Sequence, residues 1–117
     1  MKNLLSLLLI LGCFGIAQAN NIETTDFSAK TKLVKEDVIN VQLVNLQGHF
    51  TKLTLTNLDG DVEHYSEWME SKNGWSGNLN IGDLKNGKYL LTVKSNGETL
   101  KQVLKIKNGL ILFSHFS

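Results

Sequence analysis

Hydrophobic and polar positions alternate in short runs along most of this chain. From Thr31 onward, runs rich in Val, Ile, Leu and Thr are separated by Gly, Asn and Asp. Runs of this kind, bounded by turn-forming residues, are typical of β-strands. We therefore expect strands at 32–35, 38–46, 50–57, 62–68, 78–81, 88–94 and 98–107, a loop over 69–77, and a short last strand within 110–116.

Within these runs the apolar residues keep to every second position, which places them on one face of a strand. Leu53 and Leu55, for example, are separated by Thr54. The Asp-Gly pair at 59–60 and the Asn-Gly pairs at 96–97 and 108–109 are typical of hairpin turns. Seven or eight short strands at this spacing predict an all-β domain over residues 31–117, folded as an antiparallel β-sandwich.

The first nineteen residues have the layout of a secretory signal peptide. Lys2 precedes an apolar stretch that is too short to anchor in a bilayer, and Ala17-Gln18-Ala19 forms a small-x-small cleavage site. We expect residues 1–19 to be removed, the mature chain to begin at Asn20, and residues 20–30 to form a flexible lead-in.

Cys13 gives an alternative for the same segment. The run from Ile10 to Cys13 resembles a bacterial lipobox, in which the cysteine is acylated and becomes the mature N-terminus. The residues after Cys13 are apolar, which favours ordinary cleavage after Ala19. The mature chain then has no cysteine, so disulfides, thiol catalysis and thiolate metal sites are not expected.

Charge and composition exclude several classes of partner. All 12 basic residues are lysines, and removal of Lys2 leaves 11 lysines against 11 acidic residues, a formal charge of 0. We expect this charge to be dispersed without a basic stripe, which argues against binding of nucleic acid or of anionic lipid. Proline is absent, so lysine is expected to guard the sheet edges.

No motif for catalysis or metal binding is present. His49, His64 and His115 lack the spacing of a zinc site, and residues 57–61 (NLDGD) are explained by a hairpin turn rather than by a calcium loop. No serine stands in a nucleophile elbow, and no phosphate-binding loop occurs. We expect no enzyme activity, no metal and no cofactor.

Two groups of residues are candidates for binding. Trp68 and Trp75 flank the expected loop; they either cap the core, which we favour, or stack on a sugar ring or a protein partner. The run 110–113, with Leu110, Ile111 and Phe113, does not alternate. We expect a strand covered on both faces at the sandwich edge; the alternative is an exposed surface that pairs with a partner or a second copy.

Residues 36–107 resemble the type A C-terminal sorting domain of the bacterial type IX secretion system. The matching segments are 37–43 (DVINVQL), 50–60 (FTKLTLTNLDG) and 79–106, and the chain lacks the proline-containing opening of the family and continues past Ile106. The third segment is the most specific. Its matching residues are Leu84, Gly87, Tyr89, Leu91, Val93 and Gly97.

The resemblance implies a seven-stranded immunoglobulin-like sandwich and a role in export. We expect a free-standing secreted relative of the sorting domain without cargo, in the periplasm or outside the cell. It would bind a protein of the secretion apparatus or envelope, or itself. The alternatives are a carbohydrate-binding module that uses the tryptophans, and an envelope lipoprotein acylated at Cys13.

Overall fold

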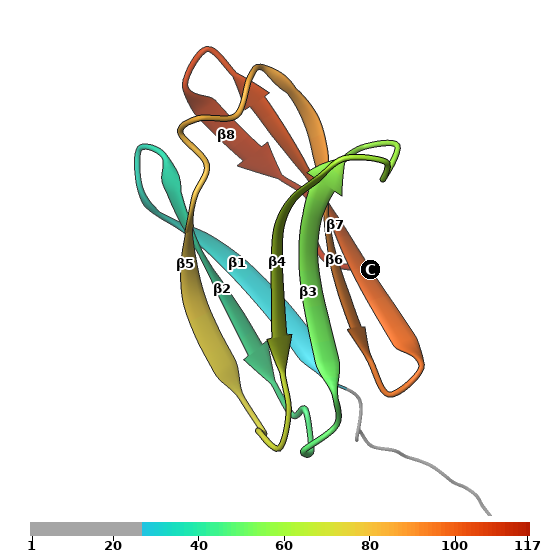
Figure 1. Ribbon diagram of the computed structural model, residues 1–117. Coiled ribbons are helices and arrows are strands. Elements are labelled where there is room, and N and C mark those ends of the chain that lie inside the picture. Colours follow the sequence, from blue (N-terminus) through green and yellow to red (C-terminus); the bar gives the residue numbers. More distant parts are fainter. Residues whose placement is uncertain (1–26) are drawn as a thin grey trace, which may run out of the picture.

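The computed structural model describes residues 27–117, which form eight β-strands and no helix. The strands are β1 (Ser28–Lys35), β2 (Val38–Val44), β3 (Thr51–Asn57), β4 (Glu63–Met69), β5 (Trp75–Asn80), β6 (Gly87–Ser95), β7 (Glu98–Lys107) and β8 (Leu110–Phe113), shown in Figure 1. The expected signal peptide, its cleavage site at Ala17, Ala19 and Asn20, and Cys13 lie outside the described residues.

The strands pair into two antiparallel sheets, which confirms the predicted β-sandwich. One sheet has the order β1-β2-β5, and the other has the order β4-β3-β6-β7-β8 (Figure 1). An immunoglobulin-like domain divides these six strands between its two sheets in the same way: strands one, two and five in one sheet, and strands three, six and seven in the other. β8 is the short last strand expected within 110–116, and it makes the eighth strand of the described chain. In the described part of the chain no helix exists that would cross a membrane.

Two strands begin well before the expected residue. β1 begins at Ser28, so the last three residues of the expected lead-in belong to the sandwich, and Phe27 before them is buried. β5 begins at Trp75, which shortens the expected loop to residues 70–74. Both extensions have a tertiary cause: the added residues pair along β2, through Ser28 with Val44 and through Trp75 with Leu43.

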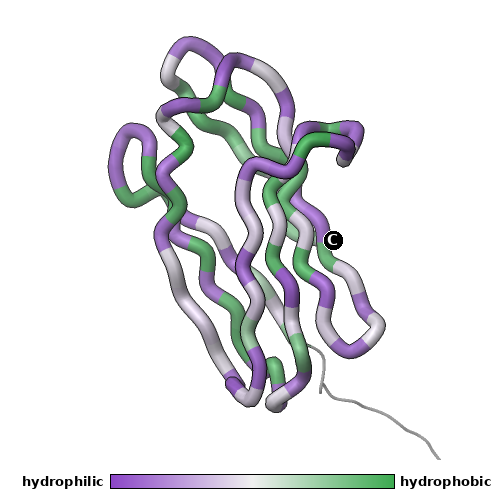
Figure 2. The backbone as a smooth tube through the Cα atoms, in the orientation of Figure 1, coloured by the Kyte–Doolittle hydropathy of each residue, from purple (hydrophilic) through white to green (hydrophobic). Residues whose placement is uncertain are grey.

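The core is a layer of aliphatic side chains between the two sheets. Inward residues alternate with outward ones along β2, β3 and β7, as the hydropathy colouring of Figure 2 shows. Ile39 and Val41 from one sheet are fully buried, as are Leu53, Leu91 and Val93 from the other. No cysteine lies in residues 27–117, so packing and backbone hydrogen bonds hold this sandwich together.

One buried hydrogen bond between side chains joins the two sheets. The hydroxyl of Thr31 in β1 donates to Oε1 of Gln102 in β7 at 2.7 Å. Nε2 of Gln102 in turn donates to the carbonyl of Ser114 at 2.6 Å. Buried polar groups need such partners, so this chain of contacts fixes β1, β7 and the segment after β8 relative to one another.

Trp75 packs against the core from the edge strand β5. Its ring lies over Gly77, where a built Cβ would be 2.5 Å from Cη2 of the indole. Because Gly77 has no side chain, the half-buried ring can lie flat along the strand and reach the core. The expectation that Trp75 caps the core is therefore confirmed.

We predict that Gly77→Ala displaces this ring. Overpacking of this kind costs about 1–3 kcal/mol of unfolding free energy. In a Trp68→Phe background, the emission of Trp75 should shift to longer wavelength as the ring becomes exposed. The same alanine in a Trp75→Leu background should cost much less; equal costs in the two backgrounds would contradict the contact.

Candidate functional site

The residues that carry the family resemblance are used by the fold itself. Leu91 and Val93 are fully buried in β6, Tyr89 is buried beside them, and the Tyr89 hydroxyl donates to the carbonyl of Lys85 at 2.6 Å. Leu84 packs against the core, and Gly97 adopts φ +79° in the β6–β7 turn. Such positions secure the sandwich, and of the residues named here Leu84 also lines the pocket described below.

The run 110–113 forms β8 at the edge of the five-stranded sheet, and most of it is exposed. Leu110 is 59% and Leu112 52% exposed, Phe113 is also exposed, and only Ile111 is half-buried. The expectation of a strand covered on both faces is wrong. β8 pairs with β7 alone, and no described layer covers the outer face on which Leu110 and Leu112 lie.

Hydrogen bonds hold the chain after β8 against β7. The Ser114 amide donates to the carbonyl of Val103 at 3.0 Å, and Ser117 and Lys101 exchange two backbone hydrogen bonds of 2.9 and 3.0 Å. Residues 110–117 therefore form one continuous border of the sheet rather than a loose tail. The other long side of β8 has no strand partner in the described part of the chain.

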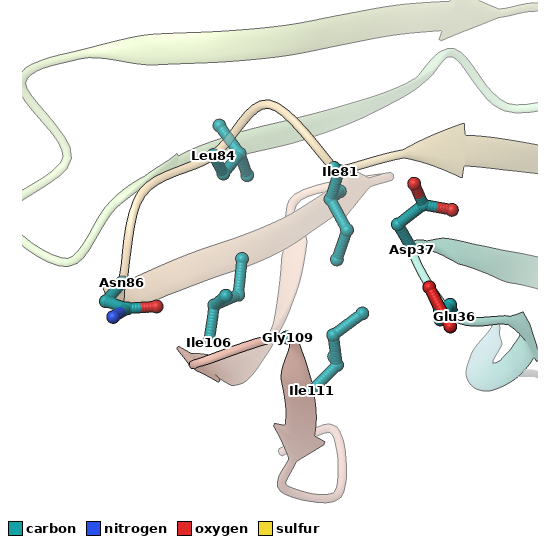
Figure 3. A pocket seen from close by; sticks show the side chains of 9 residues that line it. Glu36, Asp37, Ile81, Leu84, Asn86, Ile106, Gly109 and Ile111 are labelled. Carbon is teal, nitrogen blue, oxygen red and sulfur yellow. The ribbon is translucent and has the colours of Figure 1, made fainter.

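A pocket opens between β8 and the end of the sandwich (Figure 3). Its volume is about 250 Å³, and its lining is Glu36, Asp37, Ile81, Gly82, Leu84, Asn86, Ile106, Gly109 and Ile111. The carboxylates of the β1–β2 turn stand on one side, and the aliphatic side chains and the amide of Asn86 form the rest of the wall (Figure 3). This combination suits an aliphatic group that ends in a cation.

Trp68 is exposed on the outer face of β4. Its exposed fraction is 62%, because Met69, the next residue, takes the inward position. The ring of Phe50 lies edge-on at 6.1 Å between centroids, and Nζ of Lys52 lies 5.7 Å from the indole centroid. The expectation that Trp68 caps the core is therefore wrong, and the exposed alternative holds.

The two tryptophans do not form one platform. Trp68 points outward from the five-stranded sheet, whereas Trp75 faces the core from the three-stranded sheet. The alternative carbohydrate-binding module would use both tryptophans, and a sugar site that stacks on both rings is not assembled. Trp68 remains available to a ligand on its own.

The outer face of the five-stranded sheet gathers lysines that are scattered in the sequence. We call this set the lysine face: Lys52, Lys88, Lys94, Lys101, Lys105 and Lys107. In the ladder Lys52 stands directly opposite Lys94, and Lys88 directly opposite Lys105. The expectation of dispersed charge without a basic stripe is wrong for the folded domain. The alternating lysines of β7 were the signal in the sequence, but only the register unites them with those of β3 and β6.

The histidines and the 57–61 turn do not form a metal site in the described residues. Within residues 27–117 no group of three or more His, Cys, Asp or Glu side chains is placed to hold an ion. In the 57–61 turn, Oδ1 of Asn57 accepts from the amides of Asp61 and Val62 at 3.1 and 3.2 Å. The asparagine therefore stabilises a hairpin turn, as expected.

Tyr65 on β4 has a half-buried hydroxyl whose pKa is raised by its surroundings. Burial raises the pKa of its hydroxyl, and the charge of Glu67 and a 3.3 Å hydrogen bond to that carboxylate raise it further. The hydroxyl therefore stays protonated at neutral pH and donates to Glu67. This contact supports β4 locally.

Comparison of the chain with protein-family models, with curated proteins and with solved structures gave no match in any of the three.

We predict that Lys88→Gln stabilises the domain at low ionic strength. Like charges directly opposite in a ladder destabilise it, and relief of such a pair is worth about 0.2–1 kcal/mol. The melting temperature should rise in dilute buffer, and the gain should disappear in concentrated salt, which screens the repulsion. Lys72→Gln, in the β4–β5 loop, is the matched control and should have no such effect. A gain that does not depend on salt would contradict the repulsion.

Proposed function

We propose that this protein is a small exported, non-enzymatic β-sandwich, similar in role to a sorting domain, that binds another protein in the envelope or outside the cell. The partner contributes an extended segment that adds to the free side of β8. Strand addition of this kind uses main-chain hydrogen bonds for affinity and adjacent side-chain sites for specificity.

The observation that carries this proposal is the contrast between β8 and the other sheet edges. β1 has three lysines, at positions 30, 32 and 35, and β4 has Glu63 and Glu67. Charges on an edge strand discourage pairing with another chain. β8 has the sequence LILF and no charge. The fourth edge, β5 (WSGNLN), is also uncharged but is mostly polar, so β8 is the one apolar edge among the described strands.

The pocket beside β8 supplies the specificity. Ile111 lines the pocket and also belongs to the strand that would be extended. A partner segment paired with β8 would therefore place one inward side chain near the carboxylates of Glu36 and Asp37. A lysine or arginine fits best there, because its stem packs on the aliphatic wall while its charge meets the carboxylates.

Support for export comes from the N-terminal sequence. We predict that the protein purified from its native host begins at Asn20, as shown by intact mass and N-terminal sequencing. The alternative, an envelope lipoprotein, predicts a lipidated Cys13 at the N-terminus. An N-terminus at Met1 in cytosolic material would contradict both.

We predict that Leu112→Lys abolishes partner binding. A lysine here gives β8 the edge charge that β1 already has. Leu33→Lys on β1 is the matched control, since Leu33 is 49% and Leu112 52% exposed. A photo-crosslinking residue at position 112 should give a discrete adduct with native envelope protein, and one at position 33 should not. Excess unlabelled wild-type protein should compete the adduct away, and unlabelled Leu112→Lys should not.

Sedimentation equilibrium separates a second copy from a different partner. If the adduct is a homodimer, wild-type protein should associate and Leu112→Lys should be monomeric. Equal crosslinking at positions 33 and 112, or competition by Leu112→Lys as strong as by wild type, would contradict binding at β8.

A further inference from the structure

The lysine face is a second surface that the proposed function does not use. Its six ammonium groups project from β3, β6 and β7, on the side of the sheet away from the core. No carboxylate occupies an outward position of these three strands. Their one acidic residue is Glu98, which lies on the same side of β7 as the inward Leu100 and Gln102. Within residues 27–117 none of the six lysines forms an ion pair.

The lysines are also placed where they destabilise the domain. Two of the cross-strand pairs, Lys52 with Lys94 and Lys88 with Lys105, set like charges directly opposite each other. A bound anion between the members of each pair would remove that repulsion. The arrangement therefore has a cost in the free protein and a gain in a complex with an anion.

The spacing of the charges indicates a polymer rather than a small ion. Lys94 stands opposite Thr99 in the ladder, and Lys107 lies eight residues further along β7. At ~3.3 Å per residue the lysines extend over about 26 Å. Lys101 and Lys105 fall between these ends, so a long chain with repeated anionic groups would contact successive lysines.

A flat anionic membrane fits this face less well than a narrow chain does. The segment 59–70, which includes β4 and borders β3, has no lysine and, apart from the inward Glu67, has four carboxylates: Asp59, Asp61, Glu63 and Glu70. Neighbouring strands are ~4.8 Å apart and the Debye length is ~8 Å in physiological salt. A bilayer pressed on the lysines would therefore also meet these carboxylates, whereas a single chain laid along β6 and β7 would avoid them.

The side chains on the lysine face indicate which of the other ligand classes, nucleic acid, protein or polysaccharide, fits it best. Single-stranded nucleic acid is held by several aromatic side chains that stack successive bases, and here one indole stands at one end, next to Phe50. Protein interfaces have an apolar centre depleted of lysine. Here the apolar part of the face is one pair, Leu90 opposite Val103, and threonines and lysines surround it. Trp68, which contacts Lys52, offers one sugar ring a stacking surface beside a positive charge.

We propose that the lysine face binds an acidic polysaccharide along β6 and β7, with Trp68 at one end of the bound chain. The inference does not depend on strand addition at β8, because it uses other side chains and the outer surface of the sheet rather than its free edge.

The experiment compares two fourfold variants of equal charge. The first, Lys52→Gln/Lys88→Gln/Lys94→Gln/Lys105→Gln, removes both opposed pairs. The second, Lys30→Gln/Lys32→Gln/Lys35→Gln/Lys72→Gln, removes four lysines from β1 and the β4–β5 loop. Dextran sulfate is the probe and dextran, the same polymer without charge, is its control. Titration calorimetry measures affinity at several salt concentrations, and circular dichroism verifies folding.

The wild type and the second variant should bind dextran sulfate alike and should not bind dextran. The first variant should bind roughly tenfold or more weakly and with a shallower salt dependence, since fewer counterions are released. Trp68→Ala should weaken binding while leaving the salt dependence unchanged, because it removes stacking and no charge.

Equal loss of affinity in the two fourfold variants would overturn the proposal, since net charge and not the face would then decide binding. Failure of the wild type to bind dextran sulfate would also overturn it. Tighter binding to vesicles of anionic phospholipid or to single-stranded DNA, lost in the first variant only, would assign the face to that other class of ligand and overturn the polysaccharide.

Discussion

Packing of two sheets over one aliphatic layer is the constraint on which the rest of this structure depends. Each fully buried side chain, such as Ile39, Leu53 or Leu91, contributes about 1.5–3 kcal/mol to the free energy of unfolding. Residues 27–117 contain no cysteine, so no disulfide within them could compensate for the loss of such a contribution. A slip of one residue in any pairing would turn these side chains to solvent. The core therefore fixes the register, and the register decides which side chains meet on the outer surface.

The parts of the fold that depend on local pattern were predictable from the sequence. In β3 the apolar residues alternate without a break, and in β7 Leu100, Leu104 and Ile106 share one face. The Asn-Gly pairs at 96–97 and 108–109 place the turns that join β6, β7 and β8. The edges were less predictable. Trp68 and Leu112 are exposed because they take outward positions on edge strands, where no described layer covers them. The sequence of a strand alone does not show which layers lie next to it.

The candidate surfaces illustrate the same limit. The lysines at positions 101, 105 and 107 indicate an outward face of one strand, and they are visible in the sequence. The opposition of Lys88 to Lys105 is not visible, because it requires the pairing of β6 with β7 to be known residue by residue. Balanced composition therefore concealed a local excess of positive charge: the acidic residues lie largely in turns and along β4, and the lysines on the face of the sheet.

The resemblance and the surfaces are carried by different residues. Tyr89, Leu91 and Val93 face inward, so a domain can keep them for stability while its outward residues change freely. The two surfaces nonetheless meet, since Lys105 of the lysine face stands opposite Leu112 of β8. A strand added to β8 would widen the same outer face by one strand. Its outward residues would then continue the positive face or interrupt it with carboxylates, so the sequence of the partner segment would strengthen or weaken the binding of an anionic chain to this domain.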